Sequence, residues 1–153
     1  MNRIAKASLF VTILAVLLHP VQAVPRDFVA LADFVAPAYT AMNVAVLCAQ
    51  EDAAFLSDTA GPRGTAVHYA AHVKDEVIEG LPDTEARIVL RRAADFARTI
   101  ARAELDRISR LGPVQTEVRA WCQSTARAFI REVIVRHDEH HDQWLAAVAS
   151  ARD

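Results

Sequence analysis

The sequence predicts an all-α protein, an up-down-up-down four-helix bundle with a short N-terminal lead-in helix. Three observations predict this class. Apolar residues recur at three- and four-residue spacing over four long stretches. Gly and Pro residues separate those stretches. No run of β-branched residues alternates with polar ones between turn signals, as a strand would. Short connections favour antiparallel neighbouring helices, which gives the bundle.

Residues 1–23 have the pattern of a secretory signal peptide. Two basic residues precede an apolar run, Ser8–Leu18, which is too short to cross a hydrocarbon layer of about 30 Å as a helix. Small residues at positions 21 and 23 fit a cleavage site, so we expect cleavage after Ala23. The alternative is an uncleaved N-terminal anchor. We therefore expect a secreted, periplasmic protein whose residues 24–153 form a single helical domain.

The composition excludes several classes of function. Cleavage would remove Arg3 and Lys6 and no acidic residue, so the net charge would change from −2 to −4. An acidic surface argues against nucleic-acid binding, which requires clustered Lys and Arg. We expect no membrane span in the mature chain, because no later stretch is both long enough and apolar enough to cross a membrane. No nucleophile elbow or phosphate loop occurs, so we expect no enzyme.

The mature chain contains two cysteines, Cys48 and Cys122. Because the secretory route is oxidising, we expect them to form a disulfide that joins the first main helix to the fourth. The alternatives are two buried free thiols or a shared site for a soft metal. The many Ala residues on the inward faces bury little area, and a disulfide would offset this by a few kcal/mol.

The first elements are a lead-in helix over Pro25–Ala36 and a main helix over Ala38–Ser57, with Pro37 interrupting or kinking the chain between them. Phe28, Leu31 and Val35 share one face of the lead-in helix. The apolar stripe of the main helix comprises Ala38, Met42, Ala45, Val46, Ala49, Ala53 and Leu56.

The second helix is predicted over Thr65–Leu81, after the break at 61–64 and before Pro82. We expect its inward residues to be Val67, Ala70, Ala71, Val77, Ile78 and Leu81. Asp83 is a candidate N-cap for the next helix.

The third helix is predicted over Thr84–Leu111 and the fourth over Thr116–Ala149, with Gly112 and Pro113 between them. The stripe of the third helix contains Leu90, Ala93, Ala94, Ala97, Ile100, Ala101, Leu105, Ile108 and Leu111. Glu104 interrupts that stripe. In a bundle it would be level with Trp121 and ~25 Å from His137 along the axis.

A cluster of His137, His140 and His141 contains three of the five histidines that follow the signal peptide. At 100° per residue, His137 falls near the middle of the apolar stripe of the fourth helix, and the other two fall at its edges. Imidazoles four residues apart can bind one divalent ion, such as Zn, Cu, Ni or Co. The alternative is that these are half-buried histidines that favour a helix C-terminus.

Carboxylate and imidazole groups of the second helix are expected at the same height along the bundle axis as the His cluster. His72 and Glu76 are one turn apart, and bundle geometry places both at the end that holds His137 and His141. Asp33 is a further candidate there. The second helix would have to rotate from its apolar preference to aim these groups at the cluster, and a solvated face is the alternative.

We therefore expect a non-enzymatic divalent-metal binder that uses His137, His141 and His140 with help from His72 and Glu76. The alternative is a helical protein–protein interaction module of the cell envelope. In that role the acidic, His-bearing end would dock a partner protein and bind no metal.

Overall fold

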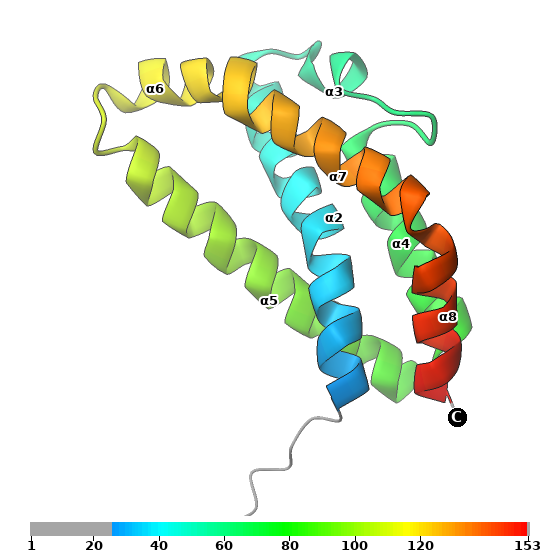
Figure 1. Ribbon diagram of the computed structural model, residues 1–153. Helices are drawn as coiled ribbons and strands as arrows, with labels where there is room; N and C mark the ends of the chain where they lie inside the picture. Colours follow the sequence, from blue (N-terminus) through cyan, green and yellow to red (C-terminus); the bar gives the residue numbers. More distant parts are fainter. Residues whose placement is uncertain (1–25, 153) are drawn as a thin grey trace, which may run out of the picture.

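The computed structural model describes residues 26–152, which are almost entirely helical, and this confirms the all-α class. The predicted signal peptide lies outside the described residues. α2 is central and contacts α4, α5, α7 and α8 (Figure 1). The helices are α2 (Arg26–Glu51), α3 (Phe55–Asp58), α4 (Ala66–Gly80), α5 (Asp83–Ile108), and a fourth segment of α6 (Val114–Trp121), η1 (Cys122–Ala126), α7 (Arg127–Glu139) and α8 (His141–Arg152).

α2 runs through Pro37 without a break, so the predicted lead-in and main helices are one helix. Leu31 and Val35 before the proline and Ala41 and Ala45 after it are all buried. Their burial forms one continuous stripe, which outweighs the single hydrogen bond that a proline removes. Because residue 37 has no N–H, the carbonyl group of residue 33 cannot receive the usual helical bond from it.

By length and composition, the stretch Phe28–Glu51 is apolar enough to cross a membrane, contrary to our expectation for the mature chain. However, 56% of its most apolar window is buried against the rest of the protein. The helices that surround α2 account for this burial. A core helix of this kind has the same composition as a membrane span, and the composition alone does not distinguish the two.

α4 is rotated relative to the prediction. Tyr69 and Val73 are buried, whereas Ile78 is 47% exposed and Ala71 is exposed as well. The rotation lets α4 pack on both α2 and α8. A Cβ atom on Gly80 would lie 2.2 Å from Val148 Cγ1, so the absence of a side chain there allows α4 and α8 to approach closely.

The fourth segment is not the single helix that the sequence predicts. α6 lies across one end of the molecule (Figure 1). The π-helical turn η1 follows it, and a break at His140, where φ is −112° and ψ is 14°, separates α7 from α8. Cys48 and Cys122 form the predicted disulfide, with their Cα atoms 5.5 Å apart. This bond joins the last turns of α2 to η1.

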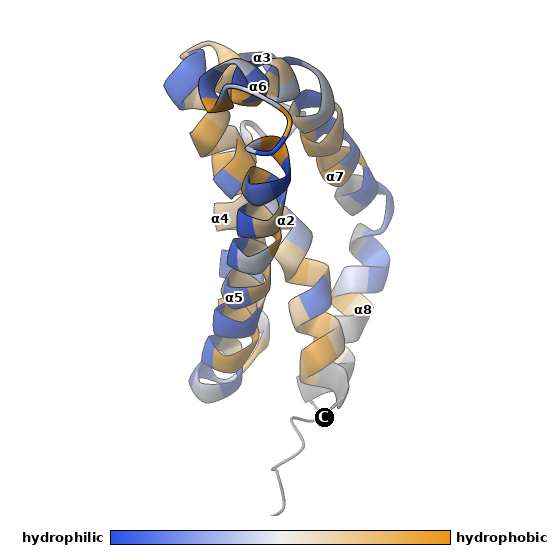
Figure 2. Cartoon of the chain, turned by 90° about the vertical axis from the view of Figure 1, so that its left-hand side faces the viewer, coloured by the Kyte–Doolittle hydropathy of each residue, from blue (hydrophilic) through white to orange (hydrophobic). Residues whose placement is uncertain are grey.

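α5 packs on α2 through Ala86, Val89 and Ala93 and then diverges towards α6 (Figures 1 and 2). Its outward side is largely hydrophilic (Figure 2). Ile100 and Leu105, predicted to be in the core, are 39% and 36% exposed. On this side the fold departs from a regular bundle, because α5 meets the fourth segment mainly at α6. The divergence leaves space between α5 and α7.

Candidate functional site

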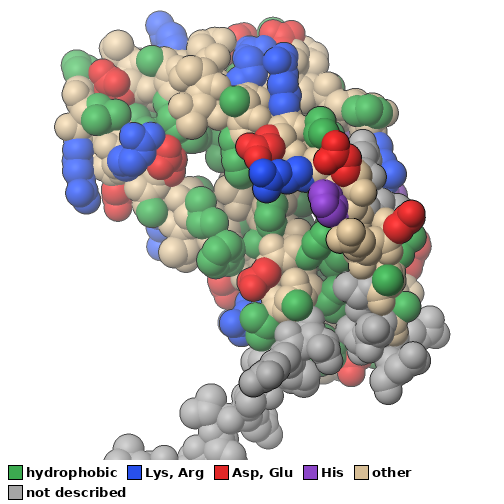
Figure 3. All heavy atoms as spheres, in the orientation of Figure 1, with side chains coloured by type: hydrophobic (Ala, Val, Ile, Leu, Met, Phe, Trp, Pro, Cys, Tyr) green, Lys and Arg blue, Asp and Glu red, His purple; other side chains and the backbone are tan. Residues whose placement is uncertain are grey.

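A cavity of about 470 Å³ occupies the space where α5 diverges, and we call it the apolar cavity. The space-filling view shows a hollow bordered by hydrophobic side chains at this place (Figure 3). Its volume is within the range of pockets that bind small molecules. The cavity is lined by Thr40, Asn43, Val44, Leu47, Ile100, Ala101, Ala103, Glu104, Leu105, Arg107, Trp121, Thr125 and Phe129.

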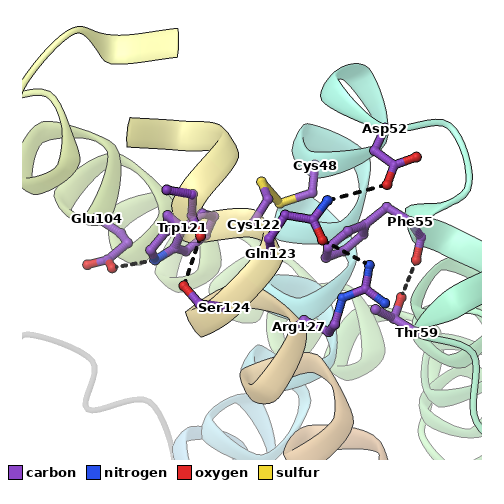
Figure 4. Close-up of a disulfide and its surroundings, with 11 residues drawn as sticks. Cys48, Asp52, Phe55, Thr59, Glu104, Trp121, Cys122, Gln123, Ser124 and Arg127 are labelled. Carbon is purple, nitrogen blue, oxygen red and sulfur yellow. Dashed lines mark hydrogen bonds between the residues drawn. A yellow bond between two sulfur atoms is a disulfide. The ribbon is translucent and has the colours of Figure 1, made fainter. Parts of the chain in front are cut away.

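The charged groups at the rim of this cavity neutralise each other. Arg107 donates two hydrogen bonds to Glu104, from Nε to Oε2 at 2.9 Å and from Nη2 to Oε1 at 2.6 Å. Trp121 Nε1 donates a third, to Glu104 Oε1 at 2.9 Å (Figure 4). The Arg107 hydrogen bond lowers the pKa of Glu104, assisted by the Arg107 charge and the Trp121 bond against partial burial. The hydrogen bond between Trp121 and Glu104 confirms that these two residues lie at the same height along the bundle.

Two polar side chains of the cavity have no hydrogen-bond partner among the described residues. Asn43 is half-buried on α2, and Thr125 is exposed on η1. A π-helical turn is rare and occurs frequently at functional sites. The Asn43 amide can both donate and accept a hydrogen bond, so it can orient a ligand that fills the cavity.

The disulfide and its surroundings fix the η1 wall of the cavity (Figure 4). Gln123 Nε2 donates to Asp52 Oδ2 at 3.4 Å. The Arg127 guanidinium lies 5.2 Å from the centre of the Phe55 ring, which is fully buried. A cation over an aromatic face adds a favourable interaction. These contacts hold the fourth segment to the end of α2 and to α3, so the cavity does not depend on α5 alone.

A second pocket of about 450 Å³ continues from the apolar cavity across Phe129, which lines both. We call it the polar pocket. It is lined by Asp33, Phe34, Pro37, Tyr69, Phe129, Glu132, Val133, Arg136 and His140. The two pockets use one face of each helix, because their residues recur every three or four positions. On α2 these are Asp33, Phe34, Pro37, Thr40, Asn43, Val44 and Leu47, and on the fourth segment Trp121, Thr125, Phe129, Glu132, Val133, Arg136 and His140.

The polar pocket brings together Asp33 and His140, two candidates that the sequence predicts at the same end of the bundle. His140 Nδ1 lies 2.8 Å from the Arg136 carbonyl oxygen. A carbonyl oxygen only accepts, so Nδ1 carries the proton and Nε2 of the neutral ring keeps its lone pair. Arg136 forms an ion pair with Glu132 at 2.5 Å. Asp33 is exposed and forms no ion pair or side-chain hydrogen bond with the side chains that are described.

Two of the other predicted metal ligands, His72 and Glu76, have protein partners. His72 Nε2 lies 3.1 Å from Glu76 Oε1 and 2.9 Å from Arg63 Nη1. Glu76 Oε2 accepts a hydrogen bond from Trp144 Nε1 at 2.9 Å, and Trp144 stacks on Phe34 with ring centres 4.5 Å apart. A metal ion at His72 Nε2 would therefore have to displace Arg63.

The sequence predicts His72 and Glu76 at the end of the bundle that holds the His cluster, and the register of α4 against α8 agrees with this placement. Glu76 meets Trp144, and Gly80 lies against Val148, four residues further along both helices. One turn back, the same register brings His72 level with residue 140. The side chains of His137 and His141 lie outside the described residues. Among the side chains that are described, no group of three or more His, Cys, Asp or Glu could hold a metal ion.

Sequence reasoning missed the apolar cavity, although two signals pointed to it. Glu104 interrupts an apolar stripe, and a carboxylate there requires partners such as Arg107 and Trp121. Ile100 and Leu105 extend the stripe past the point where α5 leaves α2.

No protein-family model, no curated protein and no solved structure matches this chain.

Proposed function

We propose that this chain is a non-enzymatic binding protein whose apolar cavity takes a small, largely apolar molecule. The observation that supports it is the cavity itself, about 470 Å³ between α2, α5 and the fourth segment. Its walls are mostly aliphatic and aromatic, and one unpartnered amide, Asn43, is available for orientation. Apolar pockets with few polar groups are the usual form of a small-molecule site.

The walls of the cavity expose apolar surface that a bound ligand would cover. Ile100 and Leu105 keep more than a third of their surface exposed. A ligand that covered them would gain roughly 25 cal/mol for each Å² of apolar surface removed from water. Since the disulfide and the Glu104 hydrogen bonds hold the walls in place, little of this gain is lost in ordering the site.

We further propose that the protein works outside the cytoplasm, in the periplasm of its cell. The Cys48–Cys122 disulfide supports this location, because such bonds persist in oxidising compartments. The predicted signal peptide over residues 1–23 points the same way. Expression with the native N-terminus, followed by fractionation and mass determination of the product, tests the location and the cleavage after Ala23.

Calorimetric titration with octanol tests the binding proposal. We expect wild-type protein to bind octanol, and Ala101→Phe to weaken the affinity at least about tenfold because the ring occupies the cavity. Ala94→Phe is the matched control, since it adds the same ring to α5 at a half-buried position that does not line the cavity. Absence of octanol binding to the wild type, or equal affinity in both variants, would overturn the proposal.

A second candidate is divalent-metal binding at the His-bearing end. The hydrogen bond from His140 to the Arg136 carbonyl favours it, because metal-binding histidines use one ring nitrogen in this way and offer the other. In this role His140 would act with His137 and His141, and His72 and Glu76 would assist after exchanging partners. Zn, Cu, Ni or Co suits such imidazole ligands.

Titration with Zn and Cu, in the wild type and in the variants His137→Ala/His141→Ala and His140→Ala, tests this candidate. Tight binding that both variants lose would support it. Absence of binding, or binding that neither variant changes, would exclude it. That result would favour the alternative role, in which this end of the protein docks a partner protein and binds no metal.

A further inference from the structure

The polar pocket carries a charge that the protein does not neutralise. Glu132 is paired with Arg136 at 2.5 Å, so these two charges cancel. Asp33 lines the same pocket and, in the part of the chain described, has no cationic partner. An anionic group entering the pocket would meet this carboxylate, whereas a cationic group would gain from it.

The pocket supplies hydrogen-bond acceptors as well as charge. The Asp33 carboxylate has two acceptor oxygens. His140 lines the same pocket, and because its Nδ1 donates to the Arg136 carbonyl, its Nε2 is an acceptor. A primary ammonium group has three N–H donors and no acceptor, which matches these groups in kind.

The other walls of the pocket also favour a cation. Phe34, Tyr69 and Phe129 supply three aromatic rings. The face of an aromatic ring attracts a nearby cation, and the attraction is strongest where water is partly excluded.

The two pockets can hold the two ends of one molecule. They meet at Phe129 and follow the same face of α2. From Asp33 in the polar pocket to Thr40 at the near edge of the apolar cavity, α2 rises by about 10 Å at 1.5 Å per residue. A medium-length alkyl chain reaches from one to the other.

We propose that the ligand is a primary alkylammonium ion, with its ammonium group beside Asp33 and its chain in the apolar cavity. The chain half of this proposal rests on the proposed function. The ammonium half rests on the polar pocket alone.

Three probes with the same chain separate the two halves: octylammonium, octanol and octanoate, titrated by calorimetry at pH 7 and low salt. We expect octylammonium to bind about fivefold to tenfold more tightly than octanol, and octanoate to bind most weakly. The preference for the ammonium should shrink as salt is added, because the Asp33 carboxylate is exposed.

Asp33→Asn should remove most of the preference for octylammonium over octanol, and Asp33→Glu should keep most of it. Glu79→Gln is the control, since it removes one negative charge from an exposed position of α4 outside both pockets. Its preference should match that of the wild type. Thermal unfolding of each variant verifies that it is folded.

The outcomes are distinguishable. Equal binding of octylammonium and octanol by the wild type would overturn the ammonium proposal and leave the apolar site standing. A preference in Asp33→Asn as large as that of the wild type would overturn the role of Asp33. Failure of every probe to bind would overturn the proposed function as well.

Discussion

The apolar cavity and the polar pocket have similar volumes, about 470 and 450 Å³, and share the ring of Phe129. They differ in how their carboxylates are treated. In the cavity, Glu104 receives hydrogen bonds from Arg107 and Trp121, whereas in the pocket Asp33 has no such partner among the described residues. A paired carboxylate stabilises the protein, and an unpaired one is available to a ligand. The cavity therefore supplies affinity, and the pocket supplies selectivity.

The largest expected effect comes from removing the covalent frame of the cavity. Cys48→Ala/Cys122→Ala opens a loop of 74 residues, and we expect the free energy of unfolding to fall by about 4 kcal/mol. Urea unfolding measures this loss. Octanol affinity should fall too, because η1 is one wall of the cavity. A loss below about 1 kcal/mol would contradict the view that the disulfide holds η1 to α2.

Phe129→Ala removes the wall that the two pockets share. Because the ring is only partly buried, we expect a loss of about 2 kcal/mol in unfolding free energy, below the range for fully buried Phe. Affinity should shift towards longer alkylammonium ions, since the two spaces merge. Phe96→Ala is the control, as Phe96 is 50% exposed on α5 and should cost less than about 0.5 kcal/mol. Equal effects of the two substitutions would contradict this role of Phe129.

Glu104→Gln tests the paired carboxylate through its pH dependence. Arg107 lowers the folded-state pKa of Glu104 below its ordinary value of 4.5. The stability it contributes is thus present above that value and is lost as the pH falls through the lower folded pKa. We expect the wild type to exceed Glu104→Gln by about 1 kcal/mol at pH 7, because the site is partly exposed, and the difference to vanish in acid. A constant difference would show that packing, and not charge, is responsible.

Asp33→Asn should have the smallest effect on stability. Since the carboxylate has no ion pair in the described structure, we expect a change within about 0.5 kcal/mol at pH 7. Urea unfolding beside Glu104→Gln makes the comparison direct. A loss as large as that of Glu104→Gln would mean that Asp33 serves the fold.

Sequence periodicity predicted the all-α class, and the cysteine count predicted the disulfide, because both depend on local or covalent facts. Periodicity identifies the apolar face of a helix but not whether a neighbour covers it. Ile100 and Leu105 continue the stripe of α5 where the neighbour has moved away. The rotation of α4, which buries Tyr69 and Val73 in place of Ala71 and Ile78, depends on packing against α8.

The His cluster and the apolar cavity also differ in whether their residues are close together in the sequence. The histidines at 137, 140 and 141 are visible in the sequence because they are neighbours along the chain. The apolar cavity is assembled from residues of α2, α5 and the fourth segment, so it has no local pattern in the sequence. Glu104 was placed level with Trp121, but its meaning as the rim of a cavity required the position of α5.

The two tryptophans of the chain report on the central claim, because they lie in different places. Trp121 lines the apolar cavity, and Trp144 is fully buried against Phe34 and Glu76. In ¹⁵N–¹H correlation spectra of the wild type, we predict that octanol shifts the indole N–H signal of Trp121 in a saturable manner and leaves that of Trp144 in place. An unmoved Trp121 signal at saturating octanol would contradict the assignment of this cavity as the binding site.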